Sequence, residues 1–174
     1  METDRVFQGS IPALYDQHLG PMIFSPYADD LAARLTDLRH GHLLETAAGT
    51  GVATRALVSA LPEGVSIVAT DLNQPMLDHA SSRVSSERLT WRQADAQMLP
   101  FPDGAFDAVV CQFGVMFFPD KLQAFAEAFR VLKPGGRFTA VDLHRAGGVA
   151  LVARRLMEAG LLYDVPTVSG RSLF

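Results

Sequence analysis

The sequence has little cysteine, little positive charge and no long apolar run. Its single cysteine, Cys111, excludes a disulfide within the chain. The net charge of −4 argues against a nucleic-acid partner, and no stretch reaches the roughly 18 apolar residues of a membrane span. The acidic N-terminus lacks the pattern of a signal peptide, and the five histidines form no metal-ligand motif. We therefore expect a cytoplasmic protein with no membrane span and no metal.

The bulk composition is that of an ordinary globular domain. Apolar residues make up 48% and charged residues 20% of the 174 residues. This length predicts one domain, divided into a helical cap (1–40), a core half (41–143) and a shortened C-terminal part (144–174). Cys111 lies in an apolar run, which predicts a buried and unreactive thiol.

Short apolar runs alternate with helical patterns along the chain. This order predicts an α/β fold with a mostly parallel, doubly wound sheet and helices on both faces. The predicted strands are residues 42–46, 65–70, 89–93, 105–111 and 137–143.

Helix signals stand between these strands. Ser25 followed by Pro26 predicts a helix start, and Asn73 predicts another. Residues 52–61 form a further helix, which Pro62 ends. A later helix is marked by apolar residues at helical spacing, with Lys133 near its end and residues 134–136 as its stop; these apolar residues are Leu122, Phe125, Ala126, Phe129 and Leu132. One more helix (149–159) and one more strand (161–168) are expected near the end.

The first predicted strand runs into a turn rich in small residues. Gly49 and Gly51 allow the backbone to turn tightly and to approach a ligand closely. The helix that follows presents free backbone N–H groups, which can hold a carboxylate. A plain strand-to-helix turn would have the same composition, so the pattern leaves both interpretations open.

Three further features fall at the carboxyl ends of predicted strands, the edge where open α/β sheets bind ligands. Asp71, twenty residues after Gly51, can accept hydrogen bonds from both hydroxyls of a ribose, or it can cap a helix. Asp95 can accept from an adenine amine, or it can simply form a turn. Gln112 can meet the other end of a nucleoside ligand, whereas the aromatic residues after it pack in the core.

With these features in place, the sequence resembles the class I S-adenosylmethionine-dependent methyltransferases, in the subgroup similar to the quinone-biosynthesis enzymes. The resemblance covers about residues 7 to 143 and depends on stretches that stand in the family's order and spacing. These stretches are residues 44–51 (LETAAGTG), 69–77, 93–96, 101–107 and 130–137.

The resemblance implies methyl transfer by in-line displacement from S-adenosylmethionine to a small acceptor, which the aromatic cap suggests is hydrophobic. The site residues that it implies are Tyr15, Glu45, Ala47, Gly49, Thr50, Gly51, Asp71, Leu72, Met76, Asp95, Ala96 and Gln112. His144 is the one candidate for a general base, although a lone histidine beside Arg145 is more often an ordinary surface residue. Tyr15 can cover the cofactor or pack within the cap. Residues 133–136 are expected to be a structural turn.

Two departures from the family stand out. Ala47 replaces the usual first glycine, a change that a negative φ would accommodate. The C-terminal strand pair is incomplete, because only thirteen residues follow Leu161. An open sheet edge would favour a homodimer.

Two other functions remain as alternatives. One is a non-catalytic or truncated module that binds S-adenosylmethionine. The other is an NAD-dependent oxidoreductase, for which the Gly51-to-Asp71 spacing fits but Thr54 occupies the place of the third glycine.

Overall fold

A parallel sheet forms the centre of the fold. The computed structural model describes residues 24–141 of the chain. Within them five strands pair in the order β3-β2-β1-β4-β5, and every neighbouring pair is parallel. The strands are β1 (Gly41–Thr46), β2 (Val65–Asp71), β3 (Leu89–Gln93), β4 (Phe106–Gln112) and β5 (Leu132–Val141). The predicted doubly wound α/β fold is confirmed for this part of the chain.

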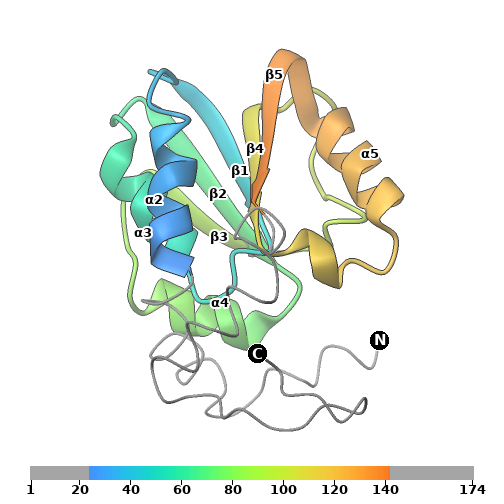
Figure 1. Ribbon diagram of the computed structural model, residues 1–174, viewed down its shortest axis with the longest axis horizontal. Coiled ribbons are helices and arrows are strands. Elements are labelled where there is room, and N and C mark those ends of the chain that lie inside the picture. The colour runs from blue at the N-terminus through green and yellow to red at the C-terminus, as the bar shows by residue number, and fades with distance from the viewer. Residues whose placement is uncertain (1–23, 142–174) are drawn as a thin grey trace, which may run out of the picture. The chain divides into compact units, whose positions relative to one another are not determined.

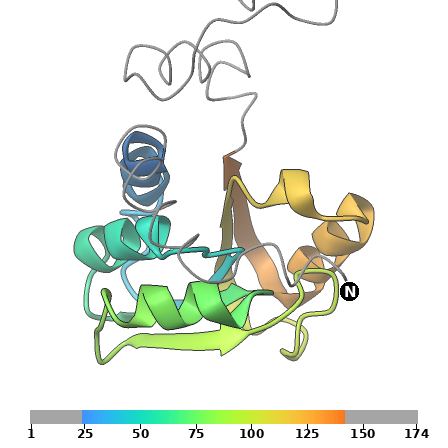
Figure 2. The ribbon, with the colours of Figure 1, turned by 90° about the horizontal axis from the view of Figure 1, so that it is seen from below.

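Helices cover both faces of the sheet. They are α2 (Ser25–Ala33), α3 (Val52–Ala60), α4 (Gln74–Ser81), the short 3-10 helix η3 (Val115–Phe117) and α5 (Lys121–Val131). Figure 2 shows α5 on the opposite side of the sheet from α2 and α3. The chain moves from β1 toward β3 in one direction and from β4 to β5 in the other. The strand order therefore reverses between β1 and β4, whose carboxyl ends meet at one edge (Figure 1).

The central strands are apolar because helices bury them from both sides. Leu43 and Leu44 on β1 and Val109 and Val110 on β4 are fully buried. Cys111, the next residue of β4, is also fully buried. Burial raises the pKa of the Cys111 thiol to about 11. The predicted burial of the thiol is confirmed, and its raised pKa agrees with the low reactivity that was expected.

Two predicted helix caps differ in detail from the structure. Helix α2 already includes Ser25, and Phe24 occupies the N-cap position without a side-chain cap. Asn73 is the N-cap residue of α4, but its side chain makes no capping bond. Its side-chain Nδ2 instead donates to the Asp71 carboxylate at 3.4 Å, and the same carboxylate accepts from the Asn73 backbone N–H. The Asn73 side chain is thus turned toward Asp71, and the Met76 N–H at the start of α4 donates to the Asn73 backbone carbonyl instead.

Helix α5 buries a different face from the one that its large residues suggested. Leu122 and Phe129 are each 82% exposed, whereas Ala124, Ala128 and Val131 face the sheet. In the core beneath α5, Ala128 and Val131 of the helix pack against large side chains from other elements. That core consists of Leu44, Leu99, Phe106, Val109, Ala128 and Val131.

Strand β5 begins five residues earlier than predicted. Helix α5 ends at Val131, and Leu132 pairs with Phe106 of β4. The register then shifts, so that Arg137 is the next residue to pair, with Ala108. Residues 133–136 are therefore a bulge within the strand edge rather than the end of a helix.

Lys133 pairs with Asp107 at the amino end of the sheet. Its Nζ lies 2.9 and 2.8 Å from the two Asp107 carboxylate oxygens, and the His42 backbone N–H donates to the same carboxylate at 2.8 Å. Asp107 thus ties β4 to both β1 and the β5 bulge.

We expect Asp107→Asn to lower the free energy of unfolding by about 1 kcal/mol, because the pair is partly exposed to solvent. Burial disfavours the Asp107 charge, but the bonds from Lys133 and His42 outweigh it and lower the pKa of Asp107. Because the pKa of Asp107 is lower in the folded chain than in the unfolded chain, where it is about 3.9, the charged carboxylate stabilises the fold at pH values above about 3.9. This stabilisation is lost as the pH falls through the pKa of the folded chain. Urea unfolding at pH 7 and below pH 3 measures the difference between the two chains, which should vanish at low pH.

Several predicted features lie outside the described residues. They are most of the N-terminal cap with Tyr15, the candidate base His144, the helix at 149–159, the strand at 161–168 and the incomplete C-terminal strand pair. The three-part division of the chain stays a prediction for the same reason. Between residues 24 and 141, no helix is long and apolar enough to cross a bilayer.

Candidate functional site

The turn between β1 and α3 is built from left-handed backbone. Gly49 has φ +56° and Gly51 has φ +81°. Ala47 also lies in this region, with φ +53°. The expectation that a negative φ would accommodate Ala47 is therefore wrong. A non-glycine residue in this conformation costs on the order of 1–2 kcal/mol, which indicates that the surrounding contacts hold the loop in place.

The two glycines serve different purposes. Gly51 packs closely, because a Cβ there would lie 3.1 Å from both the Ala80 methyl and the Trp91 ring. Gly49 has open space, since nothing lies within 4 Å of its Cβ position. Gly51 therefore lets α3 approach α4 and β3, whereas Gly49 leaves room beside the loop for a bound molecule. Thr50, between them, is buried.

Asp71 connects the end of β2 to this loop. Its Oδ2 accepts from the Gly49 N–H at 2.8 Å, and its Oδ1 accepts from the Asn73 N–H at 2.8 Å. The side chain is only 7% exposed. Burial raises the pKa of Asp71, and the two N–H donors oppose the rise. Each oxygen keeps a lone pair that a ligand hydroxyl can use.

Glu45 is a second buried acid at the same edge. It lies one residue before the end of β1 and is 1% exposed. The Thr54 hydroxyl of α3 donates to its Oε2 at 2.6 Å. Burial raises the pKa of Glu45 to about 8, the Thr54 bond opposes this rise, and the nearby Asp71 adds to it. Within residues 24–141 neither acid forms an ion pair, so the site is suited to a ligand that carries positive charge.

The residues assigned to an adenine differ in exposure. Leu72, which follows Asp71, is 40% exposed, whereas Met76 on α4 is 4% exposed. The Asp95 carboxylate accepts from the Gln97 N–H at 2.8 Å and so forms a turn. Ala96 lies within that turn and is half-buried. Leu72 thus offers apolar surface to a ligand, and the turn-forming role of Asp95 is established whatever else it binds.

Gln112 ends β4 and reaches toward α2. Its Nε2 donates to the Phe24 carbonyl at 2.8 Å, while its Oε1 is buried without a hydrogen-bond partner among the described residues. Phe113, the next residue, has φ +55° and packs its ring against Phe24 and Tyr27, with centroids 5.3 and 5.5 Å apart. The start of α2 is therefore attached to the carboxyl end of β4.

The structure thus brings Glu45, the glycine loop and Asp71 into one connected group. Asp95 follows β3 and Gln112 ends β4, two strands that β2 and β1 separate, and each has its own hydrogen-bond partners. The sequence analysis missed Thr54 and the strained Phe113. A threonine within the otherwise apolar buried face of α3 was the available signal for the first, whereas the sequence carried no signal for the second.

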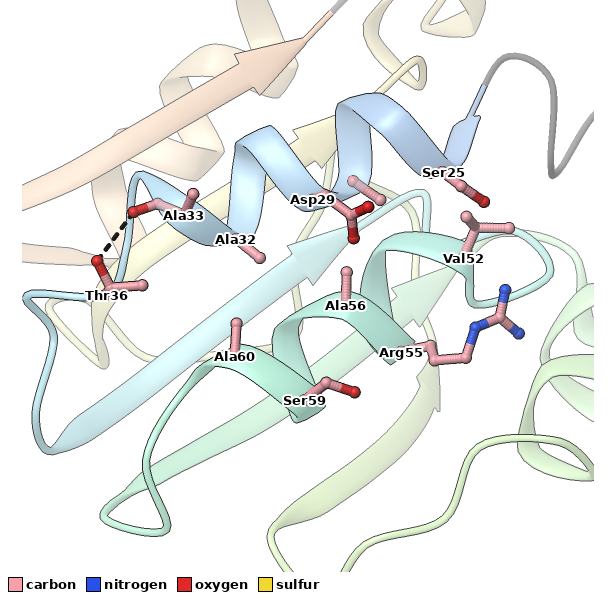
Figure 3. A pocket seen from close by; sticks show the side chains of 11 residues that line it. Ser25, Asp29, Ala32, Ala33, Thr36, Val52, Arg55, Ala56, Ser59 and Ala60 are labelled. Atoms are coloured by element: carbon pink, nitrogen blue, oxygen red, sulfur yellow. Dashed lines mark hydrogen bonds between the residues drawn. The ribbon is translucent and has the colours of Figure 1, made fainter.

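A groove of about 450 Å³ lies elsewhere, between α2 and α3 (Figure 3). Small side chains such as Ala32, Ala56 and Ala60 line it, together with Asp29 and Arg55. None of the predicted site residues lines this groove. It is therefore distinct from the edge that holds Glu45 and Asp71.

Comparison with known proteins decides the family. Residues 44–140 match the family described as "Methyltransferase domain". The chain belongs to this family. It is 42% identical over 132 residues to demethylmenaquinone methyltransferase of Thermus thermophilus, covering 74% of this chain and 60% of that protein. It is 32% identical over 134 residues to a ubiquinone/menaquinone biosynthesis C-methyltransferase of Geobacter sulfurreducens, covering 75% and 52%. The resemblance to the quinone-biosynthesis type is confirmed.

Solved structures show the same fold. A putative S-adenosylmethionine-dependent methyltransferase of Methanococcus maripaludis superposes with a TM-score of 0.72 at 21% identity, covering 90% of this chain and 74% of that one. Phosphoethanolamine N-methyltransferase 2 of Haemonchus contortus, solved with S-adenosylmethionine, gives 0.70 at 20% identity, covering 90% and 43%. The chain spans about half the length of the curated relatives it matches.

Proposed function

We propose that this chain binds S-adenosylmethionine at the carboxyl edge of β1 and β2 and transfers its methyl group to a small molecule. The observation that carries the proposal is the connected group of Glu45, the left-handed glycine loop and Asp71. Two buried acids without a cationic partner in residues 24–141 suit a ligand with an amino group and a sulfonium. The names of the quinone methyltransferases and the ligand bound to the Haemonchus contortus enzyme support the same function.

The residues present fit this cofactor. Asp71 would hold the ribose hydroxyls, and Leu72 would cover the adenine, with Asp95 and Ala96 at its edge. Glu45 and the loop from Ala47 to Gly51 would hold the amino-acid end. Gln112 would lie beside that end, where its buried Oε1 needs a donor. Met76 would support the adenine from within the core, and Tyr15 would cover the cofactor.

The chain's own task in the reaction is alignment. A bound sulfonium supplies an already activated methyl group, so these residues need only hold it in line with the acceptor. Such orientation can contribute about 7–11 kcal/mol of barrier reduction. His144 remains the candidate base if the acceptor must lose a proton.

A hydrophobic acceptor is part of this proposal. Exposed apolar side chains follow the carboxyl ends of three strands: Leu72 after β2, Met98 after β3 and Phe117 after β4, which are 40%, 75% and 64% exposed. Exposed apolar side chains in the loops after these strands suit a hydrophobic acceptor.

Methyl transfer is tested with S-adenosylmethionine labelled in its methyl group. We expect the full chain to label a small aromatic or apolar acceptor, such as a substituted hydroquinone, and to leave protein and nucleic acid unlabelled. Label found only in nucleic acid or protein would contradict the proposal. Cofactor binding without transfer to any acceptor would favour the non-catalytic module, and binding of NAD alone would favour the oxidoreductase.

Three expectations about the whole chain remain predictions. The exposed apolar face of α5, with Leu122 and Phe129, supports a homodimer, which sedimentation velocity tests. The net charge of −4 supports the absence of a nucleic-acid partner. The cytoplasmic location is tested by cell fractionation.

A further inference from the structure

The Thr54 hydroxyl faces Glu45 from inside the core. Thr54 is fully buried in the first turn of α3, and its Oγ1 lies 2.6 Å from Glu45 Oε2. A threonine hydroxyl within a helix commonly donates a hydrogen bond to a backbone carbonyl of the preceding turn. A valine of the same shape would fill this space without burying a polar group. The hydroxyl therefore contributes through Glu45 rather than through packing.

The groups around Glu45 leave it without a positive neighbour. Asp71 faces it from β2 and Cys111 from β4, while Arg55, the charged residue next to Thr54 on α3, is exposed. When two buried acids lie close together, repulsion between their negative charges disfavours the state in which both are ionised. Burial raises the pKa of Glu45 to about 8, and the nearby Asp71 adds to this rise, which favours the protonated form of Glu45 at neutral pH.

We propose that Thr54 is a positioning residue for the cofactor: it holds the Glu45 carboxyl for the cationic amino-acid end and favours release of the Glu45 proton on binding. The step is balanced, because the neutral carboxylic acid becomes a carboxylate, its proton passes to the solvent, and the ligand's positive charge replaces it. The hydroxyl donates to the carboxylate, and the amino end of α3 also favours negative charge there. This inference rests on the proposed function.

Calorimetric titration of the full chain with S-adenosylmethionine tests it. Measurements at pH 7 in phosphate and in Tris, whose ionisation enthalpies differ, give the number of protons released. We expect release approaching one proton per ligand, and an affinity that rises as the pH rises toward 8, where free Glu45 loses its proton unaided. Adenosine, which lacks the amino-acid end, should bind without proton release.

The paired variants are Thr54→Val and Thr54→Ser. Loss of a hydrogen bond to a charged group should weaken binding about ten-fold or more in Thr54→Val and move its pH profile to higher pH. Thr54→Ser should restore both. Thermal unfolding without ligand checks that both variants fold: Thr54→Val should unfold at a lower temperature than the wild type, because a buried Glu45 oxygen loses its donor, whereas Thr54→Ser should keep the hydrogen bond.

The outcomes separate the inference from the proposed function. If the wild-type chain binds S-adenosylmethionine but Thr54→Val has the same affinity and the same pH profile, the positioning role of Thr54 is wrong. Binding without proton release would also overturn it. If the folded wild-type chain binds no S-adenosylmethionine at any pH, the proposed function itself fails.

Discussion

Replacing Asp71 with alanine is expected to weaken S-adenosylmethionine binding about 100-fold. Two ribose hydroxyls would donate to this carboxylate, and each hydrogen bond to a charged acceptor contributes about 1.5 kcal/mol, which is roughly ten-fold in affinity. The substitution also removes the acceptor of the Gly49 N–H, so the loop loses its link to β2. Isothermal titration of both chains measures the change in dissociation constant.

The matched control is Asp107→Asn, at the opposite end of the sheet. Asp107 contacts Lys133 and the His42 backbone but none of the predicted site residues. We expect its affinity for S-adenosylmethionine to equal that of the wild type, despite its lower stability. Equal affinities in Asp71→Ala and wild type, with both chains folded, would remove Asp71 from the site.

Alanine at Gly49 and at Gly51 should produce opposite defects. At Gly51 the new methyl meets Ala80 and Trp91 at 3.1 Å in a left-handed backbone, so we expect a loss of about 3 kcal/mol in the free energy of unfolding. At Gly49 the methyl enters open space, and the loss should be about 1 kcal/mol. That space is where the cofactor would lie, so Gly49→Ala should bind it at least ten-fold more weakly.

Urea unfolding and ligand titration on the same two variants separate these effects. Gly51→Ala is expected to retain most of its affinity under conditions where it is folded. If Gly49→Ala bound S-adenosylmethionine as tightly as the wild type, the space beside the loop would not be the cofactor site. If both variants were equally stable, the close packing at Gly51 would not limit stability.

Patterns that follow from burial were predictable from the sequence. β1, β2 and β4 are apolar because helices cover both faces, and their positions and parallel order agree with the structure. The sequence also predicted that the glycine loop and Asp71 both lie at the carboxyl ends of strands, with Asp71 twenty residues after Gly51. The hydrogen bond from Gly49 to Asp71 is the physical link that this spacing implies.

Features that depend on competing neighbours were not predictable. The buried face of α5 was misjudged because Leu99 and Phe106, from outside the helix, had already filled the core. Lys133 was assigned to the end of a helix because its partner, Asp107, lies 26 residues away on another strand. The positive φ of Ala47 left no sign in the sequence, since alanine rarely adopts it.

Titration of the full 174-residue chain with S-adenosylmethionine, S-adenosylhomocysteine and NAD tests the central claim most directly. The account predicts micromolar binding of the two methionine-derived nucleosides and none of NAD, because the loop has Thr54 in place of a third glycine and two buried acids beside it. A folded chain that binds NAD, or that binds neither methionine-derived nucleoside, would contradict it.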